Sequence, residues 1–184
     1  MKHKSVLLDE VINYLNIHED GTYVDATLGY AGHSGEVLKR LNEKGFLFAF
    51  DQDIEAIKYS NKKLSEINDN FIIINDNFCN MKKYINKKVD GIMFDLGVSS
   101  PQLDEAERGF SFHKDAELDM RMDKRNPLNA KIVVNEYSYD KLVDIFYRFG
   151  EEKYSKSIAK SIIENRPINT TLEPVSYTHL RAHE

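Results

Sequence analysis

Four short apolar runs recur along the first half of the chain, and each has the length of a buried β-strand. They are TYVDA at Thr22–Ala26, FLFAF at Phe46–Phe50, FIII at Phe71–Ile74 and GIMF at Gly91–Phe94. None of them alternates strictly between apolar and polar residues, which is typical of parallel strands that are covered on both faces. The pattern therefore predicts four buried, parallel strands.

Helical patterns separate the first three of these strands. Residues 33–42 and 53–67 carry apolar side chains at helical spacing, and Asp53 suits the N-cap position of the second helix. A further helix is expected over Leu7–Leu15. The alternation of strands and helices predicts an α/β fold built on a parallel sheet.

The pattern changes after Asp95. Residues 95–127 contain several glycines and prolines and show no clear period. An irregular stretch of this length inside a compact domain is usually functional. Helical patterns return from Ala130, with one helix that Ser138 caps and Gly150 ends, and another over Glu152–Asn165. We therefore expect a helical module inserted after the fourth strand.

Composition narrows the class of protein without identifying a partner. The chain has 25 Lys+Arg and 30 Asp+Glu, a net charge of −5, so its charge neither requires nor excludes a nucleic acid. No apolar run approaches the roughly 20 residues that cross a bilayer. The single cysteine, Cys79, excludes an intramolecular disulfide and a cysteine-based zinc cluster. We expect a reduced, cytoplasmic protein without a membrane segment or a metal site.

The loop after the first strand is the first motif with chemical content. The sequence DATLGYAGH at Asp25–His33 lies between a predicted strand and a predicted helix. In doubly wound folds this position approaches a nucleotide, and an acidic residue about 20 residues later binds the ribose. Asp51, at the end of the second strand, has that spacing from Gly29. Loop and acid together predict a nucleoside site, although each alone also fits a tight turn and a surface acid.

The kind of nucleoside follows from what the loop lacks. A dinucleotide fingerprint needs three glycines, whereas this chain has Gly29, Ala31 and Ser34 at those places. The chain also has no Gly-Lys-Ser/Thr sequence, so a P-loop for triphosphates is excluded. S-adenosylmethionine, which has a ribose and an adenine but no phosphate, fits better.

Two further stretches follow the fourth strand. The sequence DLGVSSPQ at Asp95–Gln102 starts at the carboxyl edge of the predicted sheet, beside the nucleotide crevice. Asp95 is therefore expected either to accept a hydrogen bond from an amine undergoing methylation or to hold the methionine end of the cofactor. A simple turn acid is the alternative. The segments Glu107–Phe112 and Leu118–Asp123 place arginines near phenylalanines and methionines, which either contact RNA or fill a core.

With these residues assembled, the chain closely resembles the ribosomal RNA small subunit methyltransferase H family, the bacterial 16S rRNA cytosine-N4 methyltransferases. The likeness runs from about His3 to Thr171. The strings that carry it are YVDATLGYAGHS, FAFDQD, DLGVSSPQLDEAERGFSF, LDMRMD and FGEEKYSKSIAKSI. The resemblance implies a class I S-adenosylmethionine-dependent methyltransferase, with a Rossmann-like parallel sheet and an inserted helical domain.

The resemblance also implies a site and a reaction. The family's cofactor contacts fall on Ala31, Gly32, His33, Asp51, Phe78, Asp95 and Gln102. Ala31 stands where glycine is common, and its methyl group is tolerable if φ is negative. The implied reaction moves a methyl group from S-adenosylmethionine to the N4 amine of a cytidine in the decoding region of 16S rRNA, within the small ribosomal subunit. Either Asp95 or a backbone carbonyl in Leu96–Pro101 is expected to accept the N–H of the amine, with Asp95 as the candidate catalytic residue. Phe110 or Phe112 is expected to hold the base.

Two other functions remain open at this point. The chain would also suit a non-catalytic, ribosome-associated module that binds the cofactor only structurally. An NAD-linked oxidoreductase is the second alternative, which the broken glycine pattern disfavours.

The resemblance also divides the chain. Residues 1–104 are expected to form the N-terminal part of the cofactor-binding domain, and residues 105–173 the active-site loop and an incomplete helical insertion. Residues 174–184 resemble translated adapter sequence and are expected to be non-native.

The family core has seven strands, of which four are visible, so we expect an inactive fragment. Its fourth strand would form an exposed apolar edge with Ile92, Met93 and Phe94. The stripe of Tyr154, Ile158 and Ile162 on the last helix would lack a partner.

Overall fold

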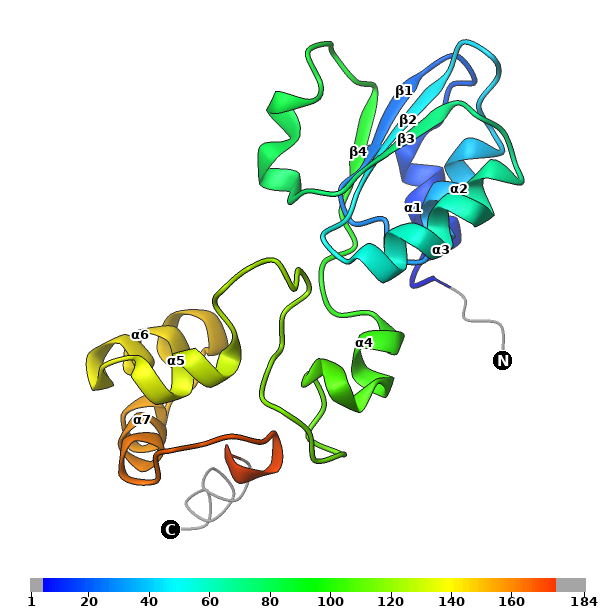
Figure 1. Ribbon diagram of the computed structural model, residues 1–184. Helices are drawn as coiled ribbons and strands as arrows, with labels where there is room; N and C mark the ends of the chain where they lie inside the picture. The colour runs from blue at the N-terminus through cyan, green and yellow to red at the C-terminus, as the bar shows by residue number, and fades with distance from the viewer. Residues whose placement is uncertain (1–4, 175–184) are drawn as a thin grey trace. The chain divides into compact units, whose positions relative to one another are not determined.

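The computed structural model describes residues 5–174 and divides the chain between Gly97 and Val98 into two compact units (Figure 1). The sequence placed the boundary after residue 104. The observed division is earlier because the short helix α4, Ser100–Asp104, belongs to the second unit.

A four-stranded parallel sheet forms the centre of the first unit, in the order β3-β2-β1-β4. The strands are β1 at Thr22–Asp25, β2 at Phe46–Phe50, β3 at Phe71–Ile74 and β4 at Gly91–Met93. All four predicted strands are confirmed, and β1 and β4 each end one residue earlier than predicted. Because β1 lies between β2 and β4, the loop after β1 is flanked by the loops of both neighbours.

Three helices cover one face of this sheet (Figure 1): α1 at Leu8–Leu15, α2 at Gly32–Leu38 and α3 at Ile54–Ser65. Their apolar side chains pack with those of the strands in one core, which includes Ile12, Tyr23, Val37, Leu47 and Leu64. The predicted cap of α3 is confirmed, because the Asp53 side chain accepts the Glu55 N–H at 3.1 Å. Helix α2 ends at Leu38, earlier than the predicted Asn42.

The opposite face is covered only in part. The 3₁₀ helix η1, Phe78–Lys83, packs there against a smaller core of Val24, Phe50 and Ile74. The strand register places Ile72 and Ile92 at the two ends of the row that contains Val24, and these two side chains are 47% and 41% exposed. The prediction of strands covered on both faces is therefore wrong at the margins of this face.

The edge strand β4 corrects the expectation of three exposed apolar side chains. Ile92 and Phe94 are exposed, but Met93 is buried in the core beneath the helices. Successive side chains of a strand point to opposite faces, and only one face is well covered here. The exposed apolar side chains of this edge strand are therefore two, Ile92 and Phe94, and not three as predicted.

The regular elements described for the second unit are helices. After α4 come the 3₁₀ helix η2 at Ala106–Arg108, α5 at Ala130–Glu136, α6 at Tyr139–Gly150 and α7 at Ser155–Glu164. An irregular stretch separates η2 from α5. Its core consists of Leu118, Leu142, Ala159, Ile162 and Ile168. Helix α4 interrupts the stretch predicted to be irregular. It is started by a capping box between Ser99 and Gln102.

The stripe on α7 has partners within this unit. Ile162 is buried in the core and Ile158 packs against it, so the expectation of an unpartnered stripe is wrong for both residues. Tyr154 precedes the helix and is exposed. Residues 175–184, expected to be non-native, lie outside the described residues.

Helix α6 ends on a left-handed residue that is not glycine. Gly150 is its last residue, and Glu151 follows with φ +50°. The N–H groups of Glu151 and Glu152 both donate to the Phe146 carbonyl, which closes the helix end. A side chain in this backbone region costs roughly 1–2 kcal/mol, a cost that glycine avoids.

We therefore expect Glu151→Gly to raise the free energy of unfolding by about 0.5–1 kcal/mol, after allowance for the greater freedom of glycine in the unfolded chain. Urea unfolding of the two proteins measures the difference. Glu151→Ala is the matched control, because it removes the carboxylate but keeps the Cβ atom. An equal gain in the alanine variant would assign the effect to charge and contradict the conformational explanation.

Candidate functional site

Three acidic side chains follow neighbouring strands of the sheet at the same edge. Asp25 ends β1, Asp51 follows β2 directly and Asp95 follows β4 by two residues. Parallel strands place their carboxyl ends together, and ligands of open α/β sheets bind outside these ends. This edge is therefore the candidate site of the first unit.

Asp51 is joined to the loop after β1 by its carboxylate. The Gly29 N–H donates to Oδ2 of Asp51 at 2.7 Å, and the Asp53 N–H donates to Oδ1 at 2.8 Å. Gly29 has φ +49°, a conformation that suits glycine. Burial raises the pKa of Asp51, and the two N–H donors oppose that increase. The structure thus brings together the loop and the acid that the sequence spacing associates.

Ala31 and Gly32 form the turn into α2. Ala31 has φ +54°, so the negative φ assumed for it in the sequence is wrong, and its side chain is fully buried. A Cβ atom on Gly32 would lie 1.7 Å from Oγ of Ser5, so a side chain there would have to displace the Ser5 hydroxyl. The N-terminal segment therefore packs directly against the start of α2.

His33 lies between the N-terminal segment and Asp95. It is 7% exposed, with Nε2 3.0 Å from the Val6 carbonyl oxygen and Nδ1 3.7 Å from Oδ2 of Asp95. The Asp95 side chain is 53% exposed. Of this pair, Asp95 is the side chain that a ligand can reach, while His33 is buried beside it.

A buried network around Asp25 is the part of the site that the sequence analysis missed. Asp25 is 2% exposed, accepts the Thr27 N–H at 3.0 Å, and accepts the Ser34 hydroxyl at 2.6 Å. The Asp95 N–H in turn donates to Oγ1 of Thr27 at 2.6 Å. The available signal was an aspartate at the end of a strand, since such a side chain can accept the backbone N–H two residues later in an Asx turn.

Phe78 and Gln102 complete the predicted set. Phe78 begins η1 after β3, is half-buried, and lies edge-on to Phe94 with 5.4 Å between ring centroids. Gln102 belongs to the second unit, where its Oε1 accepts the Ser99 N–H at 3.0 Å. The geometry at the sheet edge therefore concerns the other six predicted residues.

The arginines after α4 serve the second unit's own fold. Arg108 is 6% exposed and donates to the carbonyl oxygen of Arg121 at 3.3 Å. Arg121 pairs with both carboxylate oxygens of Asp119, at 2.5 and 3.0 Å. Phe112, in contrast, is 57% exposed. The alternative that the phenylalanines and methionines of this stretch fill a core is therefore wrong for Phe112, and also for Met120, which is 48% exposed.

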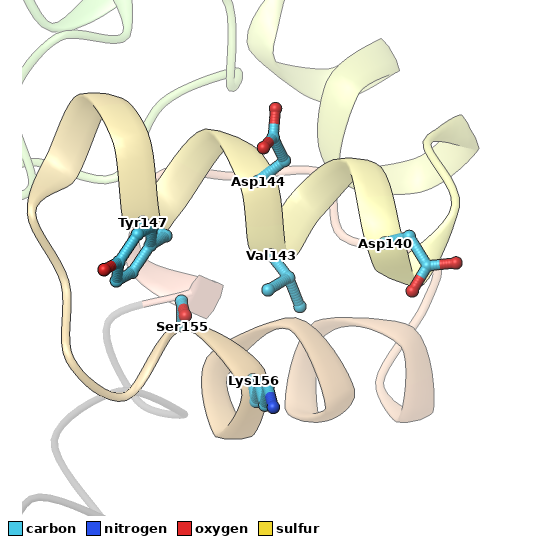
Figure 2. Close-up of a pocket in the computed structure, with 6 residues that line it drawn as sticks. All are labelled: Asp140, Val143, Asp144, Tyr147, Ser155 and Lys156. Atoms are coloured by element: carbon cyan, nitrogen blue, oxygen red, sulfur yellow. The ribbon is translucent and has the colours of Figure 1, made fainter.

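A separate hollow of about 330 Å³ lies between α6 and α7 in the second unit (Figure 2). Figure 2 shows Val143 pointing from α6 toward α7. The other lining residues are Asp140, Asp144, Tyr147, Ser155 and Lys156. Two carboxylates against one ammonium group disfavour a phosphate ligand.

Within residues 5–174 no group of three or more His, Cys, Asp or Glu side chains is placed to hold a metal ion. None of the helices described is both long and apolar enough to span a bilayer.

The buried Asp25 predicts an unusual pH dependence of stability. Burial raises its pKa from 3.8 to about 6. Above pH 7 the folded and unfolded states are both ionised, and the folded state bears the full cost of burying the charge. As the pH falls through 6, only the folded state takes up the proton, which removes the cost of the buried charge. The free energy of unfolding should therefore rise as the pH falls from 7 towards 4.

We expect Asp25→Asn to remove this contribution, which amounts to about 3 kcal/mol across the whole interval between the two pKa values. Urea unfolding at pH 5, 6 and 7.5 measures it as the difference in slope between variant and unchanged protein. Asp20→Asn, at an exposed position, is the control and should keep the original slope. If Asp25→Asn also keeps it, the carboxylate does not titrate in this range.

Comparison with known proteins agrees with the fold and the motifs. The MraW methylase family matches residues 1–180. The ribosomal RNA small subunit methyltransferase H of Mycoplasma mycoides subsp. mycoides is 56% identical over 178 residues, which are 95% of this chain and 58% of the relative. Its namesake from Mycoplasmopsis agalactiae is 53% identical over 176 residues, 94% of this chain and 58% of the relative.

Among solved structures, a candidate rRNA methylase from Clostridium thermocellum is 32% identical with a TM-score of 0.48, covering 53% of this chain and 54% of that one. The chain thus spans 58% of the length of the curated relatives named above. The family match confirms the resemblance drawn from the motifs, and the parallel sheet with its helices confirms the class I, Rossmann-like fold. The chain belongs to the MraW methylase family.

Proposed function

We propose that the full-length protein transfers a methyl group from S-adenosylmethionine to the N4 amine of a cytidine in the decoding region of 16S rRNA. Its partner is then the small ribosomal subunit, and its place of action is the cytoplasm. Membership of a methylase family supports the reaction class. The name of the curated relatives, ribosomal RNA small subunit methyltransferase H, supports the substrate.

The choice of cofactor rests on the loop after β1, where two backbone N–H groups already have hydrogen-bond partners within the protein. The Gly29 N–H is bonded to the Asp51 carboxylate, and the Ala31 N–H to the Leu28 carbonyl oxygen at 2.9 Å. A pyrophosphate needs such N–H groups free and is repelled by a carboxylate among them. A nucleoside without phosphate is compatible with both features. This favours S-adenosylmethionine over the NAD of an oxidoreductase.

The residues fit such a nucleoside. The two carboxylate oxygens of Asp51 accept backbone N–H groups of Gly29 and Asp53, and a carboxylate with about four lone-pair sites can also accept the hydroxyl groups of a ribose. Phe78 provides an apolar ring at the same edge for the adenine. Ala31, Gly32, His33, Asp95 and Gln102 are the other proposed cofactor contacts, with Ala31 and Gly32 acting through the shape of the turn.

Asp95 is the proposed catalytic residue. S-adenosylmethionine, when bound, supplies an electrophilic methyl group on a sulfonium. Asp95 would accept a hydrogen bond from the N4 amine and would take its proton when the methyl group is transferred from sulfur to nitrogen. The products are N4-methylcytidine and S-adenosylhomocysteine. The base must leave its stack to reach the site.

Asp51→Ala should weaken the binding of S-adenosylhomocysteine by about 1–3 kcal/mol, the value of hydrogen bonds to a charged acceptor. Isothermal titration calorimetry on the full-length protein measures the loss. A 2′-deoxy analogue of the ligand provides the matched control. The unchanged protein should bind the analogue less tightly, whereas Asp51→Ala should bind both ligands alike. Unchanged affinity in the variant would exclude Asp51 from the ribose site.

The substrate is tested in cells. A bacterial strain that lacks its own relative should regain N4-methylated cytidine in 16S rRNA when it expresses the full-length protein, but not the Asp95→Ala variant. Mass spectrometry of nucleosides from digested 16S rRNA measures the modification. Absence of the modified nucleoside in the complemented strain, with the protein present and folded, would contradict the substrate assignment. It would favour the non-catalytic module instead.

A further inference from the structure

The segment that follows β4 is hydrogen-bonded to a side chain of the loop that follows β1. The Ala26 N–H donates to the Met93 carbonyl oxygen at 3.0 Å, which is the last main-chain bond of this parallel pair at its carboxyl end. The next donor on the same side of β4 is the Asp95 N–H, two residues later. It donates to the hydroxyl Oγ1 of Thr27 at 2.6 Å.

We propose that Thr27 is a positioning residue for Asp95. Its hydroxyl fixes the main chain from which the reactive carboxylate projects. This inference rests on the proposed function, because it matters for the reaction only if Asp95 faces the cofactor or the amine.

The surroundings of Asp95 explain why such a bond is needed. β4 is an edge strand, and the residues that follow it are exposed, with Phe94 at 50% and Leu96 at 71%. Gly97 then has φ +142° and a Cβ atom there would meet nothing within 4 Å. Apart from the contact between the Phe94 and Phe78 rings, packing therefore does little to restrain this segment. Among the hydrogen bonds described for it, the one to Thr27 is the anchor at Asp95 itself.

Thr27 is itself held in place from beneath. Its N–H donates to Oδ1 of Asp25, and Oδ2 of Asp25 accepts the Ser34 hydroxyl from helix α2. His33, the neighbour of Ser34, is the residue whose Nδ1 lies 3.7 Å from the Asp95 carboxylate. The buried Asp25 is thus connected to both members of the His33–Asp95 pair. It is connected to Asp95 through Thr27, and to His33 through Ser34 at the start of α2.

The chemistry of the side chain makes the idea testable. Threonine offers an acceptor oxygen on a β-branched side chain with a restricted χ1 angle. Valine has the same shape but no acceptor, whereas serine keeps the hydroxyl. Thr27→Val should therefore release Asp95, and Thr27→Ser should retain most of the bond.

Amide hydrogen exchange tests the bond without any cofactor. In ¹⁵N-labelled full-length protein, the Asp95 amide should exchange about fivefold faster in Thr27→Val than in the unchanged protein, the factor expected for one net hydrogen bond. Thr27→Ser should stay close to the unchanged rate, and the amides of β2 should be unaffected in both. Equal Asp95 exchange in all three proteins would overturn the proposal.

A double-mutant cycle tests the connection with the site. Thr27→Val should weaken the binding of S-adenosylhomocysteine about fivefold. If Thr27 acts through the Asp95 carboxylate, it should weaken binding no further in an Asp95→Ala background. In an Asp51→Ala background it should cause its full fivefold loss. Equal losses in both backgrounds would overturn the positioning role and leave a general effect on the loop.

The two levels of the argument fail in different ways. If the unchanged protein binds no S-adenosylhomocysteine while the Asp95 amide still depends on Thr27, the proposed cofactor is wrong and the anchor stands. If the ligand binds but Thr27→Val changes neither exchange nor affinity, the proposed function stands and the positioning role is wrong.

Discussion

Burial of the Asp25 carboxylate is the constraint on which the edge of the sheet depends. A polar group with almost no exposure costs free energy unless donors of the protein replace the water it has lost. The Thr27 N–H and the Ser34 hydroxyl provide this replacement. To reach the same carboxylate, the loop after β1 must turn sharply and α2 must begin close to the strand. The shape of the loop is therefore a consequence of satisfying one buried acid.

The central position of β1 extends this constraint to both neighbouring strands. On the β2 side, Gly29 of the loop donates to Asp51, while on the β4 side Thr27 accepts from Asp95. The two exposed or half-buried carboxylates are thus both positioned by one loop. Asp51 and Asp95, the proposed ribose-binding and catalytic residues, are therefore both hydrogen-bonded to the same loop. The N-terminal segment adds to this arrangement through Val6 and His33.

Local features of the fold were predictable from the sequence, and long-range ones were not. The four strands and the cap at Asp53 follow from short patterns. Helix α4 was not predicted, although Ser99 and Gln102 have the spacing of a capping box. Of the three apolar side chains expected to be exposed on β4, only Met93 is buried. Its burial depends on which face of the sheet the helices cover, which the local sequence does not tell. The positive φ of Ala31 and the bond from Asp95 to Thr27 depend on contacts between distant residues. For the site, spacing associated Asp51 with its loop but gave no view of the network beneath it.

The unfavourable features of the first unit are concentrated in this same loop. Asp25 is buried at a raised pKa, and Ala31 adopts a left-handed backbone that costs roughly 1–2 kcal/mol for a residue with a side chain. Such costs persist where the surrounding contacts determine the conformation, and they concentrate at sites of function. Here the surrounding contacts are the Ser34 hydroxyl, the packing of Ser5 against Gly32 and the Asp51 carboxylate on Gly29. A loop selected for stability alone would carry glycine at position 31 and an apolar residue at position 25. Its departure from both choices is explained if the loop holds two neighbouring carboxylates in a fixed geometry.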